Sequence, residues 1–321
     1  MKLIPGISVI ICCYNSEKRI IPTLEHLAKQ QTPEDLPWEI VLVDNCCTDK
    51  TISVALESWS SLFHQDMAKL TIVEEKKAGL SNARKTGVFT ARYTLVCFCD
   101  DDNWLNEYYI TTASRIMAEN PEIGILAGRG LPVADIELPE WFYRNQDSYA
   151  CGELADESGD VTDRKWVWGA GMVLRNEYIR QLYKTGFTHI SYDRKGASLS
   201  SGGDTEICYW HVLTGKKLWY DRDLEFYHKI ASERLTKAGS EELFMAHEKS
   251  FNELSPYFPL IFSDSYQNTN KLVLFFKALK MVMLKQDGKQ LFVHLRPLFD
   301  GFIDTRTIKI MDLVEKFKSN Q

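Results

Sequence analysis

The first 130 residues alternate short apolar runs with segments of helical spacing, and this alternation restricts the fold more than any other feature. Apolar runs rich in β-branched residues predict strands at 7–12, 39–44, 70–75 and 93–98. Because these runs are continuously apolar, they are typical of strands covered on both faces, as in a parallel sheet. The segments between them begin at Ser, Gly or Thr-Asp and predict helices. The pattern therefore predicts a doubly wound α/β domain with helices on both faces of a mostly parallel sheet.

Polar residues follow three of these predicted strands directly. Tyr14 and Asn15 come after the first strand, Asp44 closes the second, and Asp100–Asp102 close the fourth. Ligands of doubly wound sheets bind outside the carboxyl ends of the strands. We therefore expect these side chains to line one cleft. Three adjacent carboxylates repel one another, so the triplet indicates either a solvated turn or a site for a cation with oxygen ligands.

The remainder of the chain is less regular. Residues 144–165 are polar and acidic, which predicts a mobile connection. Beyond it the sequence predicts further elements, namely a strand at 166–175, a helix near 176–185, a Gly/Ser-rich loop at 195–204, a helix at 205–214 and a strand at 217–228. Residues after about 236 are typical of helices without the rhythm of a parallel sheet.

Charge and cysteine usage exclude several classes of protein. The net charge of −6 argues against generic nucleic-acid binding through a basic surface. The eight cysteines show no C-x-x-C spacing, which favours buried thiols in a reducing cytoplasm over disulfides or zinc. The N-terminus lacks the pattern of a signal peptide, and no apolar run reaches the length of a spanning helix. The sequence thus predicts a cytoplasmic protein.

Six motifs, taken in order, carry a family resemblance. They are "SVIICCYNSEKRI", "VLVDNCCTDKT", "GLSNARKTG", "FCDDDNW", "WGAGMVLR" and "SGGDTEICYWHV". Over roughly residues 5–235 the chain resembles the family 2 glycosyltransferases, which have the Rossmann-like GT-A fold. The resemblance implies an inverting transferase that uses a nucleotide diphosphate sugar, usually with Mg²⁺ or Mn²⁺. It also implies a catalytic domain at 1–235, with a nucleotide-binding half at 1–130, an acceptor-binding half at 131–235, and a helical extension at 236–321.

The acidic triplet takes its expected roles from this resemblance. Asp100 is expected at the donor ribose or the metal, Asp101 beside the donor, and Asp102 on the metal. A divalent cation commonly takes one or two protein carboxylates plus the substrate phosphates. His228 matches the family's late histidine at the metal or diphosphate, and Arg234 is expected near the phosphates. An exposed acidic turn and a structural histidine are the alternatives.

The nucleotide is expected at the residues that follow the first two strands. The resemblance assigns Asp44 to the base, typically uracil, and places Tyr14 and Asn15 in the same base and ribose pocket. Arg84 is expected to face the diphosphate, for which a guanidinium is well suited. A helix cap at Asp44 and an ordinary solvated helix Arg84 are the alternatives.

The general base is expected at Asp204. The family has a Glu-Asp pair here, and this chain has Gly203 in place of that Glu. A base of this kind takes the proton of the acceptor hydroxyl, and Glu206 is the fallback. An N-cap is the competing interpretation of Asp204. Gly169 and Gly171 are expected on the edge of the strand at 166–175, where a ligand can approach the backbone closely.

These assignments favour transfer from a UDP-sugar to a glycan or lipid-linked oligosaccharide in the synthesis of a surface polysaccharide. A nucleotidyltransferase is an alternative, although "CCYNSEKR" contains no phosphate-binding glycine; a glycan-binding paralogue without catalysis is another. The last 51 residues carry a net charge of +5, and within them 271–285 predicts a basic amphipathic helix. That helix is compatible with peripheral contact at the inner face of a membrane, with packing on the catalytic domain, or with an oligomer interface.

Overall fold

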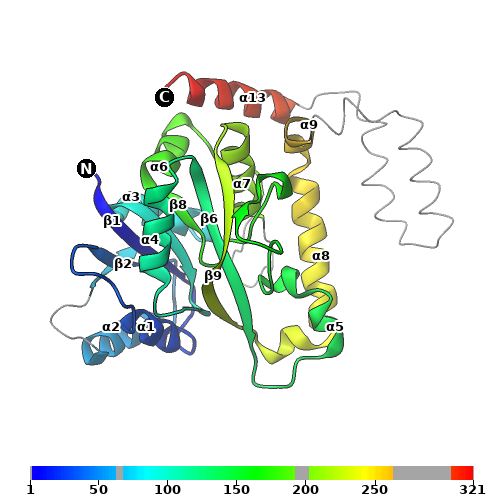
Figure 1. Ribbon diagram of the computed structural model, residues 1–321. Helices are drawn as coiled ribbons and strands as arrows, with labels where there is room; N and C mark the ends of the chain where they lie inside the picture. The colour runs from blue at the N-terminus through cyan, green and yellow to red at the C-terminus, as the bar shows by residue number, and fades with distance from the viewer. Residues whose placement is uncertain (1, 63–67, 192–201, 263–304, 321) are drawn as a thin grey trace. The chain divides into compact units, whose positions relative to one another are not determined.

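The computed structural model describes residues 2–62, 68–191, 202–262 and 305–320 (Figure 1). The chain divides into two compact units, Met1–Glu253 and Leu254–Gln321. The elements of the first unit are β1 (Ile4–Cys13), α1 (Ile20–Ala28), β2 (Trp38–Asp44), α2 (Thr51–Leu62), β3 (Lys69–Glu74), α3 (Leu80–Thr90), β4 (Tyr93–Asp100), β5 (Asn103–Leu105), α4 (Tyr109–Glu119), β6 (Ile123–Val133), α5 (Glu140–Tyr143), η1 (Gln146–Tyr149), β7 (Gly159–Asp160), η2 (Thr162–Arg164), β8 (Val173–Arg175), α6 (Asn176–Thr185), α7 (Gly203–Leu213), β9 (Lys217–Lys229), η3 (Ser232–Leu235) and α8 (Lys237–Glu253).

The strands form one mixed sheet in the order β3-β2-β1-β4-β8-β6-β9-β5, and β7 pairs with β9. The first four predicted strands are confirmed, and β3, β2, β1 and β4 run parallel. The central residues of β1, β2 and β4, such as Val9, Val41 and Val96, are fully buried, as continuous apolar runs require, whereas β3 at the edge of the sheet is only partly buried. Strand β8 is antiparallel to both β4 and β6, so the sheet is mostly but not entirely parallel.

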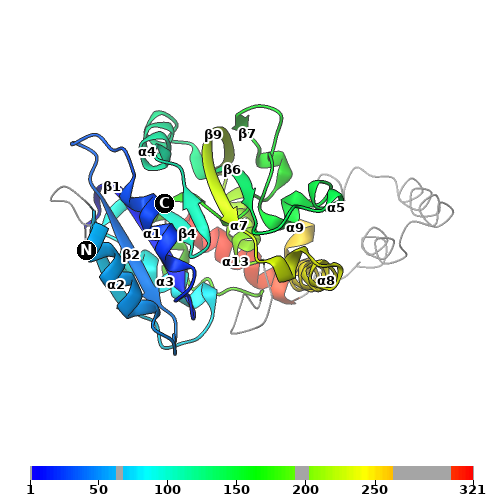
Figure 2. The ribbon, with the colours of Figure 1, turned by 90° about the horizontal axis from the view of Figure 1, so that it is seen from below.

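Helices cover both faces of the sheet (Figures 1 and 2). Helices α1 and α2 pack against each other, whereas α3 packs on β1 and β2 and also contacts α6. This division follows from the strand order: the chain moves outward from β1 through β2 to β3 and then returns to β4 on the other side of β1. A right-handed crossover in the opposite direction places its helix on the opposite face. The gap between β1 and β4 is therefore the switch point, where ligands of such sheets bind.

Strand register places the predicted polar residues at one edge. Cys13 lies opposite Asp44, and Cys12 lies opposite Asp100. The side chains that follow β1, β2 and β4 therefore share the carboxyl edge of the sheet, as the sequence predicts.

Two of the predicted segments differ in the structure. Residues 144–165 are not a loose connection, because Tyr149 and Cys151 are buried in an apolar cluster with Phe142 and Ile230. Hydrophobic anchors spaced among polar residues hold the segment against β6 and β9.

The strand predicted at 166–175 is shorter than expected. Only Val173–Arg175 form a strand, because Gly171 adopts a left-handed φ of +69° and the amide of Met172 turns back to the carbonyl of Gly169 at 3.2 Å. The apolar run predicts a strand along its whole length, but its two glycines permit a turn, and the strand begins only after that turn, at Val173.

The second unit contains helical elements. They are η4 (Ser255–Tyr257), α9 (Phe258–Ile261) and α13 (Thr305–Lys318). The hydroxyl of Thr307 donates to the carbonyl of Pro256 at 2.8 Å and so joins α13 to η4. Within the described ranges, no helix is long and apolar enough to cross a membrane. The amphipathic helix predicted at 271–285 lies outside the described residues, as does most of the Gly/Ser-rich loop at 195–204, so both stay predictions.

One buried histidine of α7 makes the stability of the fold depend on pH. His211 is fully buried, its Nδ1–H donates to the carbonyl of Ile207 at 2.8 Å, and its ring packs on Tyr178 at 4.8 Å. Burial lowers the pKa of His211 to about 4, against an unfolded value of about 6.5. The unfolded chain therefore binds the proton more readily, and stability is lost as the pH falls from about 6.5 to about 4.

We expect the protonation of His211 to cost roughly 3 kcal/mol of unfolding free energy between pH 7 and pH 4. Urea unfolding of wild type and His211→Gln at both pH values measures this contribution. The wild type should lose more stability than the variant by about that amount, because only the wild type must protonate this ring on unfolding. An equal loss in both proteins would show that His211 is not the titrating group.

Candidate active site

The three carboxylates of the acidic triplet point to three different partners. Asp100 Oδ1 lies 3.9 Å from Nη2 of Arg84 on α3. Asp101 Oδ2 lies 2.7 Å from Nη2 of Arg19, which precedes α1. Asp102 Oδ1 lies 3.8 Å from Nε2 of His228 on β9. This divergence explains how three adjacent anions fit at the end of one strand.

Pairing of β5 with β9 brings Asp102 and His228 together. In this antiparallel pair Asn103 lies opposite His228, and the amide of Lys229 donates to the carbonyl of Asp102 at 2.9 Å. The Nδ1 of His228 lies 2.6 Å from the carbonyl oxygen of Tyr149. A carbonyl only accepts, so Nδ1 carries the hydrogen, and in the neutral ring Nε2 presents a lone pair toward Asp102.

This donor set fits a divalent cation that shares its ligands with a substrate. A carboxylate and a neutral imidazole with its Nδ1–H held by a carbonyl are an ordinary pair of metal ligands. No cluster of three or more His, Cys, Asp or Glu side chains suited to holding a metal occurs in the part of the chain that the structure describes. The remaining ligands would come from phosphate oxygens and water, as is usual for Mg²⁺ sites.

Asp204 stands at the start of α7 and contacts the loop before β8. Its Oδ2 accepts the amide hydrogen of Gly169 at 2.8 Å, and its Oδ1 accepts that of Thr205 at 3.1 Å. A Cβ at position 169 would lie 2.8 Å from Asp204 Oδ2 and 2.8 Å from Nη2 of Arg84. Glycine is therefore needed at 169 because the side chains of Asp204 and Arg84 occupy the space that a Cβ would take.

Arg84 holds a positive charge inside the protein at this point. Its side chain is only 4% exposed, and its guanidinium carbon lies 5.0 Å from the centroid of the Phe98 ring. The arginine is therefore not the solvated helix residue that was the alternative. A guanidinium beside both Asp100 and Asp204 places positive charge at the switch point of the sheet.

Glu206 differs from Asp204 although only one residue separates them. Its side chain is fully buried, and its carboxylate accepts the amide hydrogen of Ile190 at 3.0 and 3.1 Å. Nδ1 of His189 lies 3.1 Å from Glu206 Oε2. These contacts fix the chain before position 191 onto α7, which is a structural use of the carboxylate.

The residues expected at the nucleotide base gather around the turn after β2. Asp44 Oδ1 accepts the amide hydrogen of Cys47 at 2.9 Å and so closes the turn after β2, whereas the first amide of α2, at Thr51, donates to Asp49 Oδ1 at 3.0 Å. Asn15 Oδ1 accepts the amide hydrogen of Thr48 at 2.8 Å, and Asn15 itself adopts a left-handed φ of 51°. Tyr14 is 43% exposed beside them. The three predicted residues are thus brought together.

Arg234 and Gly171 each contact a tyrosine. The guanidinium of Arg234 packs over the ring of Tyr149 at 5.4 Å, and Tyr149 is the residue whose carbonyl oxygen binds His228. A Cβ on Gly171 would lie 2.3 Å from the hydroxyl of Tyr109, which donates to the carbonyl of Gly171 at 2.7 Å. The glycine at 171 is therefore required by packing on Tyr109.

Sequence reasoning assigned no role to Ser16, Arg19 or Tyr149. Ser16 and Arg19 belong to the quoted motif "SVIICCYNSEKRI", so a cation three residues after Ser16 and directly before α1 was an available signal. Tyr149 acts through its backbone carbonyl, which leaves no mark on the side-chain pattern.

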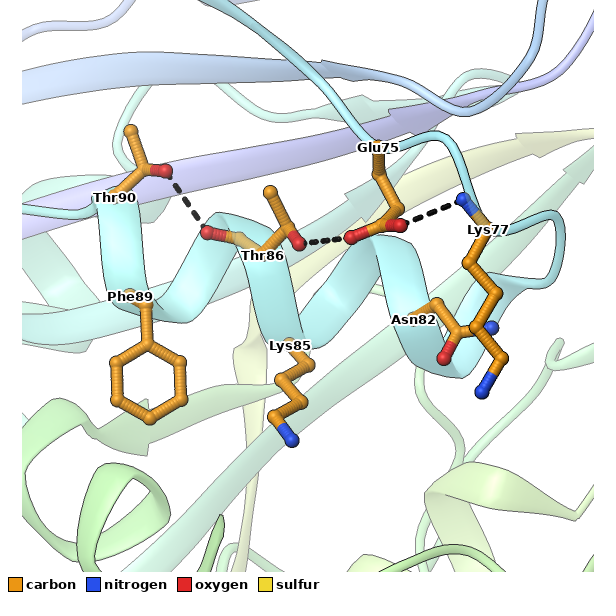
Figure 3. A pocket seen from close by; sticks show the side chains of 7 residues that line it. All are labelled: Glu75, Lys77, Asn82, Lys85, Thr86, Phe89 and Thr90. Carbon is orange, nitrogen blue, oxygen red and sulfur yellow. Dashed lines mark hydrogen bonds between the residues drawn. The ribbon is translucent and has the colours of Figure 1, made fainter. Parts of the chain in front are cut away.

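A surface pocket of about 450 Å³ lies elsewhere, on the outer side of α3 (Figure 3). Glu75, Lys77, Lys85 and Phe89 are among its lining residues. In Figure 3, Glu75 accepts hydrogen bonds from the hydroxyl of Thr86 and the amide of Lys77, so its carboxylate is used locally. None of the site carboxylates lines this pocket.

Known proteins resemble the chain in both sequence and structure. Residues 8–192 match the family described as Glycosyl transferase family 2. The poly(ribitol-phosphate) β-N-acetylglucosaminyltransferase TarS of Staphylococcus aureus is 31% identical over 131 residues, 39% of this chain but only 22% of that protein. The glycosyltransferase GlyG of Streptococcus pneumoniae is 26% identical over 149 residues, 46% of this chain and 47% of that one.

Two solved structures share the fold. Residues 1–349 of S. aureus TarS in complex with UDP-GlcNAc superpose with a TM-score of 0.56 and 17% identity, over 92% of this chain and 91% of that one. The mannosyltransferase PcManGT of Pyrobaculum calidifontis, in complex with GDP-Man and Mn²⁺, gives 0.54 and 18% over 98% and 87%. These neighbours confirm the fold predicted from the sequence.

Proposed function

The chain belongs to glycosyltransferase family 2, and from this premise we propose that it transfers a sugar from a UDP-sugar to a glycan or lipid-linked acceptor, with inversion and with the help of a divalent cation. One observation carries the proposal: Asp204, Arg84 and Asp100 converge at the switch point of the sheet. Asp204 and Arg84 are each 2.8 Å from the Cβ position of Gly169, and Arg84 is 3.9 Å from Asp100. A carboxylate and a buried guanidinium at one point suit a reaction that removes a proton and releases a diphosphate.

Each carboxylate has a distinct task in this proposal. Asp102 and His228 would hold Mn²⁺ or Mg²⁺, and Asp100 would contact the donor ribose or the same cation. A bound cation supplies electrostatic stabilisation of the charge that grows on the departing diphosphate. Arg84 adds positive charge from the protein, and Arg234 supports the site through Tyr149.

The reaction step balances with Asp204 as general base. The oxygen of the acceptor hydroxyl attacks the anomeric carbon of the donor and forms the new glycosidic bond. The bond between that carbon and the diphosphate oxygen breaks, and the nucleoside diphosphate leaves with the electron pair. Asp204 takes the hydroxyl proton, while the amide of Gly169 holds Oδ2 and fixes the direction of the carboxylate.

Glu206 is not proposed as the base. Both of its oxygens accept from the amide of Ile190, and the side chain is fully buried. Its removal would release the chain before position 191 from α7, so its effect on transfer would be indirect.

The choice of nucleotide and acceptor is supported by Asp44 and by the similar proteins. A carboxylate has two oxygens, so Asp44 can cap its own turn and also accept from an N–H of uracil. TarS is a structural neighbour in complex with UDP-GlcNAc, whereas PcManGT is in complex with GDP-Man. TarS is named for a poly(ribitol-phosphate) acceptor, which supports a role in surface polysaccharide synthesis.

A thermal-shift screen of UDP- and GDP-sugars with and without Mn²⁺ tests the proposal. We expect UDP-sugars to stabilise the protein only in the presence of Mn²⁺, by ~2.7 kcal/mol at a hundredfold excess over Kd. Mn²⁺ alone and UDP alone serve as controls. Stabilisation by GDP-sugars instead would overturn the choice of uridine. If no nucleotide sugar stabilises the protein, the proposed donor class is wrong. Slow release of free sugar from the donor that binds would separate an active enzyme from a glycan-binding paralogue.

A further inference from the structure

The middle carboxylate of the acidic triplet is bound by the segment that follows β1. Asp101 Oδ2 accepts from the hydroxyl of Ser16 and, at 2.7 Å, from Nη2 of Arg19. The carbonyl of Asp101 accepts from the hydroxyl of Thr23 at 2.9 Å. Ser16 and Thr23 are fully buried, whereas the side chain of Arg19 is 45% exposed.

The partners of Asp101 are themselves fixed by the fold. The left-handed Asn15 turns the chain after β1, and the amide of Ser16 donates to the hydroxyl of Thr51 at 2.7 Å. The carbonyl of Ser16 accepts from the amides of Arg19 and Ile20 at 2.8 and 3.0 Å, so the turn that leads into α1 is held by Ser16. Asp101 is therefore attached to the rigid corner between β1 and α1.

On the basis of the proposed function, we propose that Asp101 is a positioning residue and not a donor contact. The Arg19–Asp101 pair, defined here as the tether, holds the acidic turn on α1. The flanking side chains then reach different partners, with Asp100 near Arg84 and Asp102 near His228. Both side-chain bonds are made by Oδ2, and the positive charge of the Arg19 guanidinium beside it opposes the approach of a further cation to this carboxylate.

Charge gives a second reason for the tether. Three adjacent anions at one strand end repel one another, and a cation beside the middle one lowers this repulsion. Without Arg19, the carboxylate of Asp101 would compete with Asp102 for the bound cation and with Asp100 for Arg84. Partners that orient metal ligands typically change metal affinity by 10–100-fold when removed.

Calorimetric titration of the full chain with UDP at increasing Mn²⁺ tests the tether. The variants are Arg19→Ala, Asp101→Asn and the double variant, with melting curves to confirm that each is folded. We expect that the Mn²⁺ concentration giving half of the maximal gain in UDP affinity is about tenfold higher for each single variant than for wild type. The double variant should need no more than either single one, because both substitutions break the same contact. Arg19→Lys should restore part of the loss.

Arg115→Ala is the matched control, because Arg115 forms an exposed pair with Glu119 at 3.0 Å on α4, and it should leave the Mn²⁺ requirement unchanged. If Asp101 were a metal ligand, Asp101→Asn would abolish the Mn²⁺ effect, and Arg19→Ala would strengthen Mn²⁺ binding by freeing the carboxylate. Either that pattern of results, or a double variant whose loss equals the sum of the two single losses, would contradict the proposal that Asp101 is a positioning residue. If wild type binds UDP equally well without Mn²⁺, the cation of the proposed function is wrong, and the positioning role of Asp101, which depends on that cation, is wrong as well.

Discussion

Asp204→Asn should lower the rate of sugar transfer at least a hundredfold while donor affinity stays near that of wild type. Asparagine has the shape of aspartate, and its amide oxygen can still accept the hydrogen of Gly169 that orients the wild-type carboxylate at 2.8 Å. It cannot take the proton of the acceptor hydroxyl, and general-base assistance contributes ~10²–10⁴-fold. Release of UDP from the donor measures the rate, and calorimetry measures donor affinity.

Glu206→Gln is the informative comparison for this experiment. Its carboxylate binds Ile190 and His189 inside the protein, so we expect a lower melting temperature and a smaller loss of rate. If Glu206→Gln removes transfer in a folded protein and Asp204→Asn does not, then the base has been assigned to the wrong carboxylate. Loss of donor affinity in Asp204→Asn would indicate a role in binding instead.

The geometry of a helix explains why only one of these two acids faces the site. Each residue turns the helix by about 100°, so Asp204 and Glu206 project from nearly opposite sides of α7. The sequence placed both acids in one motif and left Glu206 as a fallback. Helix periodicity could have separated them, once the start of α7 at Gly203 was known.

The residues at the carboxyl edge of the sheet were predictable because their meeting there depends only on the strands being parallel. Apolar runs located β1, β2 and β4, and the parallel arrangement then placed Asp44 and Asp100–Asp102 at one edge. The divergence of the triplet was not predictable. It depends on Arg19, Arg84 and His228, which come from three segments far apart in the chain.

The turn at Gly169 and Gly171 shows a different limit of sequence reasoning. Hydrophobic periodicity reports burial, and Val167 and Met172 of this segment are both fully buried. It does not report the sign of φ, so a left-handed turn inside an apolar run was read as a strand. The reason for glycine at 169, which is the space taken by Asp204 and Arg84, appears only when α7 and α3 are packed together.

Asp102→Ala should abolish the dependence of UDP binding on Mn²⁺. The substitution removes the carboxylate that stands 3.8 Å from Nε2 of His228 and leaves the imidazole as the one proposed protein ligand on that side. A Mg²⁺- or Mn²⁺-type site commonly needs at least one carboxylate beside the substrate phosphates, so the cation and the diphosphate should no longer bind together. Calorimetric titration with UDP, with and without Mn²⁺, should give the same weak affinity for the variant.

Asp163→Ala is the matched control, because Asp163 is a fully exposed acid whose carboxylate lies 3.8 Å from Lys165. Its removal should leave the Mn²⁺ effect intact, which separates a ligand from a general loss of negative charge. His228→Ala should weaken the effect in the same direction as Asp102→Ala, because Tyr149 holds the imidazole with its Nε2 toward the carboxylate. If UDP binding by Asp102→Ala still tightens with Mn²⁺ as in wild type, the cation lies elsewhere and Asp102 is only part of an acidic turn.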